Sequence, residues 1–94
     1  MPTIRIQHVV PDFDRWKRAF ESDPMDRKGS GVTRYQVYRS VNEPNLVMID
    51  LELDTLPQSQ AFLERLEQMW AGPGGAVMQN AQALIVDTVE SKSV

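Results

Sequence analysis

Few residues in this chain could do chemistry, and one histidine stands out among them. His8 is the single histidine, and there is no cysteine. Imidazole has the ordinary pKa closest to neutrality, so His8 is the candidate base or hydrogen-bond donor to a bound phenol, quinone or acid. The structural alternative is a buried histidine that bonds a carboxylate or backbone group at the corner between a strand and a helix.

Aromatic side chains and one acid accompany this histidine as candidates. Trp16 and Trp70 fall on the apolar stripes of two predicted helices, so they are either core residues or pocket walls that stack on a flat ligand. Tyr35 and Tyr38 lie on opposite sides of a predicted strand, and Asp50 falls in the middle of the next one, where water is scarce. We predict these five as ligand-pocket residues, with the histidine as the catalytic one.

Charged side chains in the same two strands should find partners. Arg39 lies between apolar neighbours, so we expect it to bind a carboxylate. Asp50 or Glu52, across the hairpin, is the expected partner of Arg34 or Tyr38. Ion pairing at the strand ends is the structural interpretation of these residues, against a role in ligand binding.

Composition excludes several kinds of function. One histidine and no cysteine give no credible transition-metal site, and no phosphate-binding or dinucleotide-binding glycine motif occurs, so we predict neither a metal nor a cofactor. A net charge of −3 without any basic block argues against nucleic acid as a partner. No apolar run reaches the about 18 residues of a membrane helix, and no signal-peptide core is present, which favours a cytoplasmic protein.

The elements that must position these residues follow one another in the order βαββαβ. Asp12 is a predicted N-cap, Thr55 with Gln58 forms a capping box, and Gly72-Pro73-Gly74-Gly75 should end the second helix. The strands are expected over residues 3–10, 32–41, 46–53 and 82–89. We predict one ferredoxin-like α+β domain over residues 1–94, a four-stranded antiparallel sheet with two helices on one face.

The uncovered face of that sheet predicts a second molecule. Alternation places His8 with three apolar residues of its strand on one face. In the third strand it places four residues toward the helices: Val47, Ile49, Leu51 and Leu53. Leu46 and Met48 point the other way, and the last strand is apolar on both sides. Since soluble monomers avoid apolar patches of a few hundred Å², we expect a homodimer that encloses a small-molecule pocket. Scattered exposed apolar residues are the alternative.

The first half of the chain resembles a known superfamily. His8-Val9-Val10 followed by Asp12-Phe13-Asp14 and Trp16-Lys17, then Val37-Tyr38-Arg39 with Glu43-Pro44-Asn45 after a turn, is similar to the opening of dimeric α+β barrel proteins. Gly31, before the second strand, also fits. These proteins include the antibiotic biosynthesis monooxygenases, and the second half of the chain matches them only in topology.

The resemblance implies a function as well as a fold. If the protein is an enzyme, it implies cofactor-independent oxidation or rearrangement of an aromatic or polyketide-like substrate, with His8 as the base. A non-catalytic ligand-binding or regulatory dimer is the alternative, and its pocket would take a small apolar or aromatic ligand. Some barrels of this kind degrade haem, but they need a haem-ligating histidine in the second helix, where this chain has none.

Overall fold

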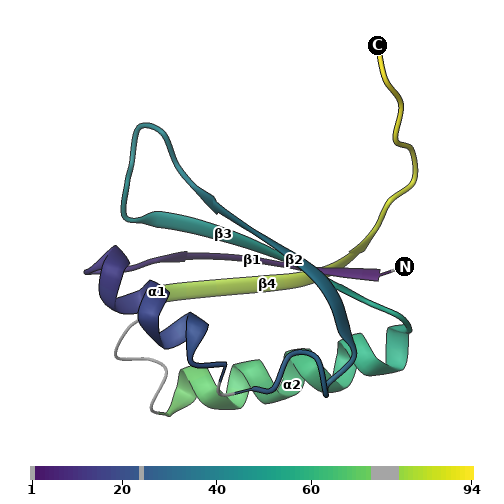
Figure 1. Cartoon of the computed structure of the whole chain (residues 1–94), viewed down its shortest axis with the longest axis horizontal. Coiled ribbons are helices and arrows are strands. Elements are labelled where there is room, and N and C mark those ends of the chain that lie inside the picture. The colour runs from purple at the N-terminus through teal and green to yellow at the C-terminus, as the bar shows by residue number, and fades with distance from the viewer. Residues whose placement is uncertain (1, 24, 73–78) are drawn as a thin grey trace.

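The structure is a computed structural model that describes residues 2–23, 25–72 and 79–94. Its elements follow the predicted order βαββαβ. The strands and helices are β1 (Pro2–Val9), α1 (Phe13–Glu21), β2 (Val32–Arg39), β3 (Leu46–Leu53), α2 (Leu56–Ala71) and β4 (Gln79–Asp87). The predicted ferredoxin-like α+β fold is confirmed, with both helices on one side of the sheet (Figure 1).

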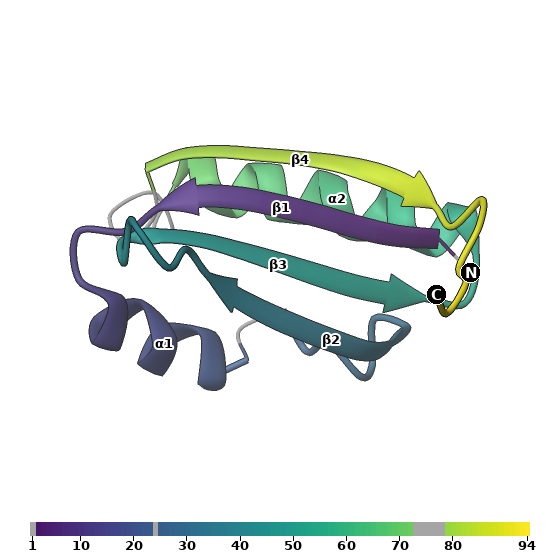
Figure 2. The ribbon, with the colours of Figure 1, turned by 90° about the horizontal axis from the view of Figure 1, so that it is seen from above.

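The four strands form one antiparallel sheet in the order β2-β3-β1-β4, which Figure 2 shows from above. β1 therefore lies between two strands that are distant from it in the sequence. Its register with β3 pairs Arg5 with Asp50 and His8 with Val47. Its register with β4 pairs Arg5 with Leu84. Paired residues share a face, so these registers decide which side chains meet.

Both helices begin where the sequence predicts. The Asp12 carboxylate accepts a hydrogen bond from the Arg15 amide, and Thr55 and Gln58 form a complete capping box at the start of α2. α2 ends at Ala71, as predicted from the glycine that follows, whereas residues 73–75 of that predicted stop lie outside the described residues.

Gly31 precedes β2 with a φ of +99°, in the region that favours glycine. A Cβ atom there would lie 2.8 Å from Nε2 at the end of the flexible Gln58 side chain, which would have to shift, and the positive φ would strain any other residue.

The core fills the space between the sheet and the helices. β3 places Val47, Ile49, Leu51 and Leu53 in it, each at most 2% exposed, which confirms the predicted helix side of that strand. The backbone of α2 approaches β1, β3 and β4 closely. α1 lies beside the β2 edge in Figure 2 and reaches the core through large aromatic side chains.

Strand ends differ from the prediction. β2 ends at Arg39, and Val41 lies beyond it, fully exposed in the turn. β4 spans Gln79–Asp87 rather than residues 82–89, because it pairs along the whole of β1, from Pro2 opposite Asp87 to Val9 opposite Gln79. Val89, expected in this strand, lies outside it. The length of β4 depends on its pairing with β1, which is distant in the sequence, so the local apolar pattern did not predict where β4 begins and ends.

Candidate functional site

His8 lies on the covered face of the sheet, at the end of β1 that leads into α1. Its side chain is 1% exposed. The indole ring of Trp16, itself 3% exposed, lies 5.2 Å from the imidazole centroid at a tilt of 51°. The strand alternation places His8 here and the first turns of α1 bring Trp16 over it, so the two residues form one buried pair.

Within the described residues, this histidine has no hydrogen-bond partner. Among the described residues, three buried side-chain nitrogen or oxygen atoms lack any partner: Nδ1 and Nε2 of His8, and Nε1 of Trp70. The carboxylate or backbone partner of the structural alternative is thus not found within the described part of the chain. Trp70 lies near the end of α2, the helix that covers the same face. All three atoms belong to residues predicted as site residues.

Burial without a partner has an energetic and an electrostatic consequence. An unsatisfied buried polar group costs about 1–3 kcal/mol, and such groups are rare in native proteins. Burial also lowers the pKa of His8 to about 4, because the dry surroundings disfavour the imidazolium. His8 is therefore neutral at pH 7, with one nitrogen able to accept a hydrogen bond and the other able to donate one.

Aromatic rings extend from this pair toward the surface. Trp16 stacks with Phe20 at 5.2 Å, and Phe20 meets the edge of Tyr35, also at 5.2 Å. Tyr35 is 45% exposed, and the Arg27 guanidinium lies 5.0 Å from its ring centroid. Tyr35 thus stands at the outer end of the aromatic cluster, with Trp16 at its inner end beside His8.

The prediction that Arg39 binds a carboxylate is wrong. Its Nε atom donates to the Pro44 carbonyl oxygen at 2.7 Å, and its guanidinium lies 4.1 Å from the Phe13 ring centroid. A carbonyl and an aromatic face satisfy a weakly hydrated guanidinium at the surface, so no carboxylate is needed there.

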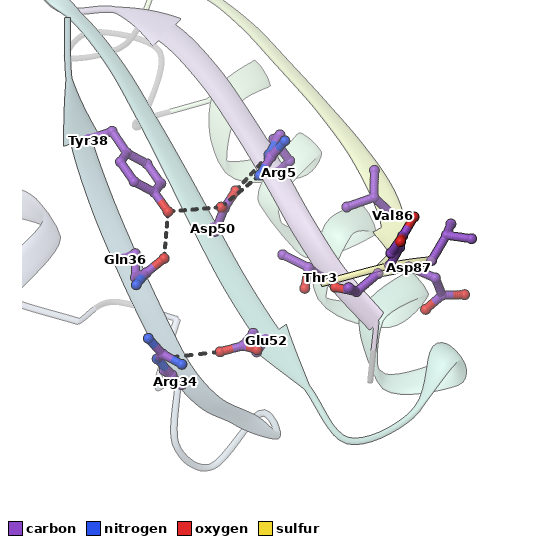
Figure 3. Close-up of a pocket in the computed structure, with 12 residues that line it drawn as sticks. Thr3, Arg5, Arg34, Gln36, Tyr38, Asp50, Glu52, Val86 and Asp87 are labelled. Carbon is purple, nitrogen blue, oxygen red and sulfur yellow. Dashed lines mark hydrogen bonds and ion pairs between the residues drawn. The ribbon is translucent and has the colours of Figure 1, made fainter. Parts of the chain in front are cut away.

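Asp50 and Tyr38 lie on the open face of the sheet, away from the helices (Figure 3). Arg5 donates to both carboxylate oxygens of Asp50, at 2.9 Å from Nε and 3.0 Å from Nη2. The Tyr38 hydroxyl lies 3.3 Å from Asp50 Oδ2 and also bonds the Gln36 side chain. The predicted contact between Asp50 and Tyr38 is confirmed. We did not predict the contact with Arg5.

This network shifts two pKa values. Hydrogen bonds from Arg5 lower the pKa of Asp50 despite its burial. Burial, followed by the charge of Asp50, raises the pKa of Tyr38. Arg34 and Glu52 form a looser pair nearby, 3.6 Å apart, again as predicted across the hairpin. The charges on this face are therefore matched in pairs.

The paired charges line one side of a groove of about 690 Å³ on the open face. Residues 86–90, at the end of β4 and just beyond it, line the other side. The six predicted site residues thus fall into three places. His8, Trp16 and Trp70 lie on the helix side, Tyr38 and Asp50 lie at the open-face groove, and Tyr35 lies at the exposed end of the aromatic cluster.

Neither a metal-ion site nor a membrane-spanning helix is found in the described part of the chain. No group of three or more His, Asp or Glu residues that could hold a metal ion occurs within residues 2–23, 25–72 and 79–94. None of the helices described there is long and apolar enough to cross a membrane.

Comparison with known proteins shows the fold. No protein-family model and no curated protein sequence matches the chain. A mutant of SnoaB, a cofactor-independent oxygenase from Streptomyces nogalater, superimposes with a TM-score of 0.78 at 11% identity, covering 96% of this chain and 94% of that one. An antibiotic biosynthesis monooxygenase matches with a TM-score of 0.65 at 11% identity, over 96% and 100% of the two chains.

A third structure is MhuD with two manganese protoporphyrin IX molecules bound per active site. Its TM-score is 0.68 at 15% identity, over 98% of this chain and 99% of that one. The chain therefore has the fold of antibiotic biosynthesis monooxygenase-like proteins, which confirms the resemblance seen in its first half.

Proposed function

We propose that the protein is a homodimer that binds a small aromatic molecule on the helix side of its sheet and oxidises it without a cofactor. One observation carries the proposal: the unpartnered buried side-chain atoms of the described residues all belong to His8 and Trp70. A ligand with polar groups in the right places would satisfy them and recover the cost of leaving them unbonded.

The hydrogen-bonding capacity of these atoms indicates which polar groups the ligand should carry. A neutral imidazole nitrogen accepts a hydrogen bond from a phenol hydroxyl, and the Trp70 N–H group donates one to a carbonyl oxygen. Trp16 offers a flat apolar surface beside His8. An aromatic molecule that carries both a hydroxyl and a carbonyl group fits this set, as in polyketide-derived anthrones.

His8 would act as the base. It would take the hydroxyl proton of the anthrol tautomer of an anthrone, to which it is hydrogen-bonded, and the resulting anion would be oxidised by molecular oxygen at the opposite carbon of the central ring. One oxygen atom becomes the new carbonyl of the quinone, and the other leaves as water. The low pKa of His8 keeps it unprotonated and ready at pH 7, although burial weakens it as a base. The SnoaB likeness supports this type of reaction.

The test is oxygen-dependent conversion of anthrone to anthraquinone by the wild type and by His8→Ala. We expect the variant to lose most of its turnover, about 100-fold or more for a general base. The control is Glu64→Ala, which removes an exposed side chain from α2, away from the proposed dimer interface, and should keep wild-type turnover. Unchanged turnover in His8→Ala would remove the histidine from the mechanism.

A non-catalytic ligand-binding dimer is the second candidate, because the same unbonded atoms serve binding without turnover. It predicts that anthrone or a hydroxyanthraquinone quenches the tryptophan fluorescence while no oxygen is consumed. We do not propose haem degradation, because α2 contains no histidine.

The homodimer would form through the open face. Leu84 is 56% exposed there, and Leu46, Met48 and Val86 lie partly exposed on the same side. Burial of such apolar area is worth about 25 cal/mol per Å². The paired charges at the centre would not oppose association strongly, since each already has its partner. A cytoplasmic location stays a prediction.

A further inference from the structure

The start of β2 borders a second groove, of about 670 Å³, which we call the edge groove. β2 forms one edge of the sheet, with α1 beside it (Figure 2). The segment after α1, the first residues of β2 and the turn after β3 form the edge groove. Its charged and aromatic lining residues are Asp23, Arg27, Lys28, Arg34, Tyr35 and Asp54. Three cations thus face two carboxylates, an excess of one positive charge in a chain whose net charge is −3.

The edge groove is separate from the site proposed around His8. His8 pairs with Val47 of β3, which in turn pairs with Arg39 at the end of β2. Tyr35 lies four residues before Arg39 in the same strand, so its level in the sheet is about 13 Å away along the strand. A ligand in the edge groove therefore meets a different set of polar groups.

Arg27 is held in place at the edge groove by contacts on several sides. Its guanidinium lies 4.0 Å from the centroid of the Phe20 ring and 5.0 Å from that of Tyr35. Its Nη1 atom donates to the Phe20 carbonyl oxygen at 2.8 Å, and its Nε atom lies 3.5 Å from the Asp23 carboxylate. The side chain is only 15% exposed, so its position is largely fixed before any ligand binds. Donors that are already fixed bind an anion with little further loss of side-chain entropy.

These contacts leave hydrogen-bond donors of the edge groove unused. Among residues 2–23, 25–72 and 79–94, Nη2 of Arg27 donates no hydrogen bond, and exposed Lys28 forms no ion pair. Arg34 is 65% exposed and lies 3.6 Å from Glu52, so this pair is loose. Tying the segment after α1 to that helix explains the role of Nη1. It explains neither Nη2 nor the two further cations in the same groove.

We infer that the edge groove binds a flat aromatic carboxylate. The planar guanidinium of Arg27 matches a carboxylate in shape, and Lys28 adds a second positive charge. Tyr35 is 45% exposed and offers ring surface to the aromatic part of the ligand. One negative charge on the ligand equals the positive excess of the groove, whereas a neutral aromatic molecule would leave that excess unmatched.

The test is a titration of nitrogen-15-labelled protein with 2-naphthoate at low salt, followed by the amide NMR signals. We expect saturable shifts at Arg27, Lys28 and Arg34, and about tenfold weaker binding of the neutral 2-naphthamide. Arg27→Gln should weaken 2-naphthoate binding about tenfold, and Lys28→Gln about threefold. The matched control is Arg15→Gln, which removes the same charge from an exposed position of α1 outside the groove and should leave the dissociation constant unchanged.

Asp54 provides a gain of affinity as a further test. Its exposed carboxylate lines the edge groove and forms no ion pair within the described part of the chain, so it should repel a bound anion. Asp54→Asn keeps the size of the side chain and should tighten 2-naphthoate binding about threefold. Unfolding cannot increase affinity. This variant therefore keeps the inference testable where Arg27→Gln disturbs the segment that Arg27 holds.

The outcomes separate the edge groove from the proposed function. Shifts at Arg27 and Lys28 that His8→Ala leaves unchanged would support an independent site. Shifts confined to the surroundings of His8 and Trp70 would overturn the edge groove and leave the proposed function standing. Equal binding of 2-naphthoate and 2-naphthamide, no binding at millimolar concentration, or a dissociation constant that neither Lys28→Gln nor Asp54→Asn changes would each overturn the edge groove as a carboxylate site.

Discussion

The two faces of the sheet differ in how their partly or fully buried polar groups are hydrogen-bonded. On the open face, Asp50 holds a bidentate pair with Arg5 and a contact with Tyr38, so its charge is compensated where it is partly buried. On the covered face, His8 is fully buried, and neither ring nitrogen has a partner among the residues that the structure describes. The charged group is thus compensated on the open face, while the buried imidazole has no partner in the described part of the chain.

This difference supports the proposed site on the covered face. A satisfied ion pair on a sheet is explained by the fold alone, because it repays its own desolvation. An unsatisfied buried imidazole lowers the stability of the free protein, and a fold that keeps it needs another reason to do so. Ligand binding is such a reason, and substitutions on each face of the sheet test it.

The largest effect should come from Trp16, which joins the covered face to α1. Trp16→Ala should lower the free energy of unfolding by about 3–5 kcal/mol, because the change leaves a cavity beside His8 and Phe20. Urea denaturation measures this loss. A smaller loss than that of a change to alanine at exposed Leu56 would contradict the assignment of Trp16 to the core.

A strong pH dependence should follow from His8. Its pKa is about 4 in the folded protein and 6.5 in the unfolded chain, so the unfolded state binds more protons between these values. Stability should be complete above pH 6.5 and fall by up to about 3 kcal/mol as the pH drops to 4. The difference between wild-type and His8→Leu urea curves over this range isolates the effect from that of the carboxylates.

Replacing His8 itself should stabilise the protein at pH 7. His8→Leu removes two unsatisfied nitrogens from an apolar site, so the free energy of unfolding should rise by about 1–3 kcal/mol, while binding of a hydroxyanthraquinone is lost. The two readouts, denaturation and fluorescence quenching, should move in opposite directions. A destabilised variant would mean that the imidazole is held by a bond in the free protein.

The smallest of these effects should come from the open face. Asp50→Asn should lower stability by only about 1 kcal/mol, because Arg5 is more than half exposed and water screens the pair. Since the pKa of Asp50 is lowered in the folded state, its contribution is present at neutral pH and lost below the ordinary value of 3.8. Acid denaturation of the wild type and the variant should therefore converge at low pH.

The sequence predicted what depends on local patterns. Alternation in β1 put His8 on the buried face, and the residue types at Asp12 and Thr55 set the starts of both helices. The contact between Arg5 and Asp50 needed the pairing of β1 with β3, which are distant in sequence, so no local pattern contained it. The predicted fold does place these two strands side by side, and this topology was the information from which the contact could have been predicted.

The sequence suggested candidate residues for the proposed site, but not how they are arranged. His8, Trp16 and Trp70 were chosen for chemistry and apolar spacing, and they lie on the same side of the sheet. Tyr38 and Asp50 lie on the other side, since residue type alone does not tell which face of a strand belongs to which site. That His8 would have no partner within the described residues could not be predicted, because this depends on every element packed around the imidazole.

The state of the imidazole in the free protein tests the central claim most directly. Since His8 is the single histidine, a nitrogen-15 label on histidine gives one assignable pair of ring signals. We predict titration with a midpoint of about 4, and a change in the ring nitrogen shifts at pH 7 when a hydroxyanthraquinone is added. A midpoint near 6.5, with no response to that ligand, would contradict the claim that His8 is buried without a hydrogen bond and binds a ligand.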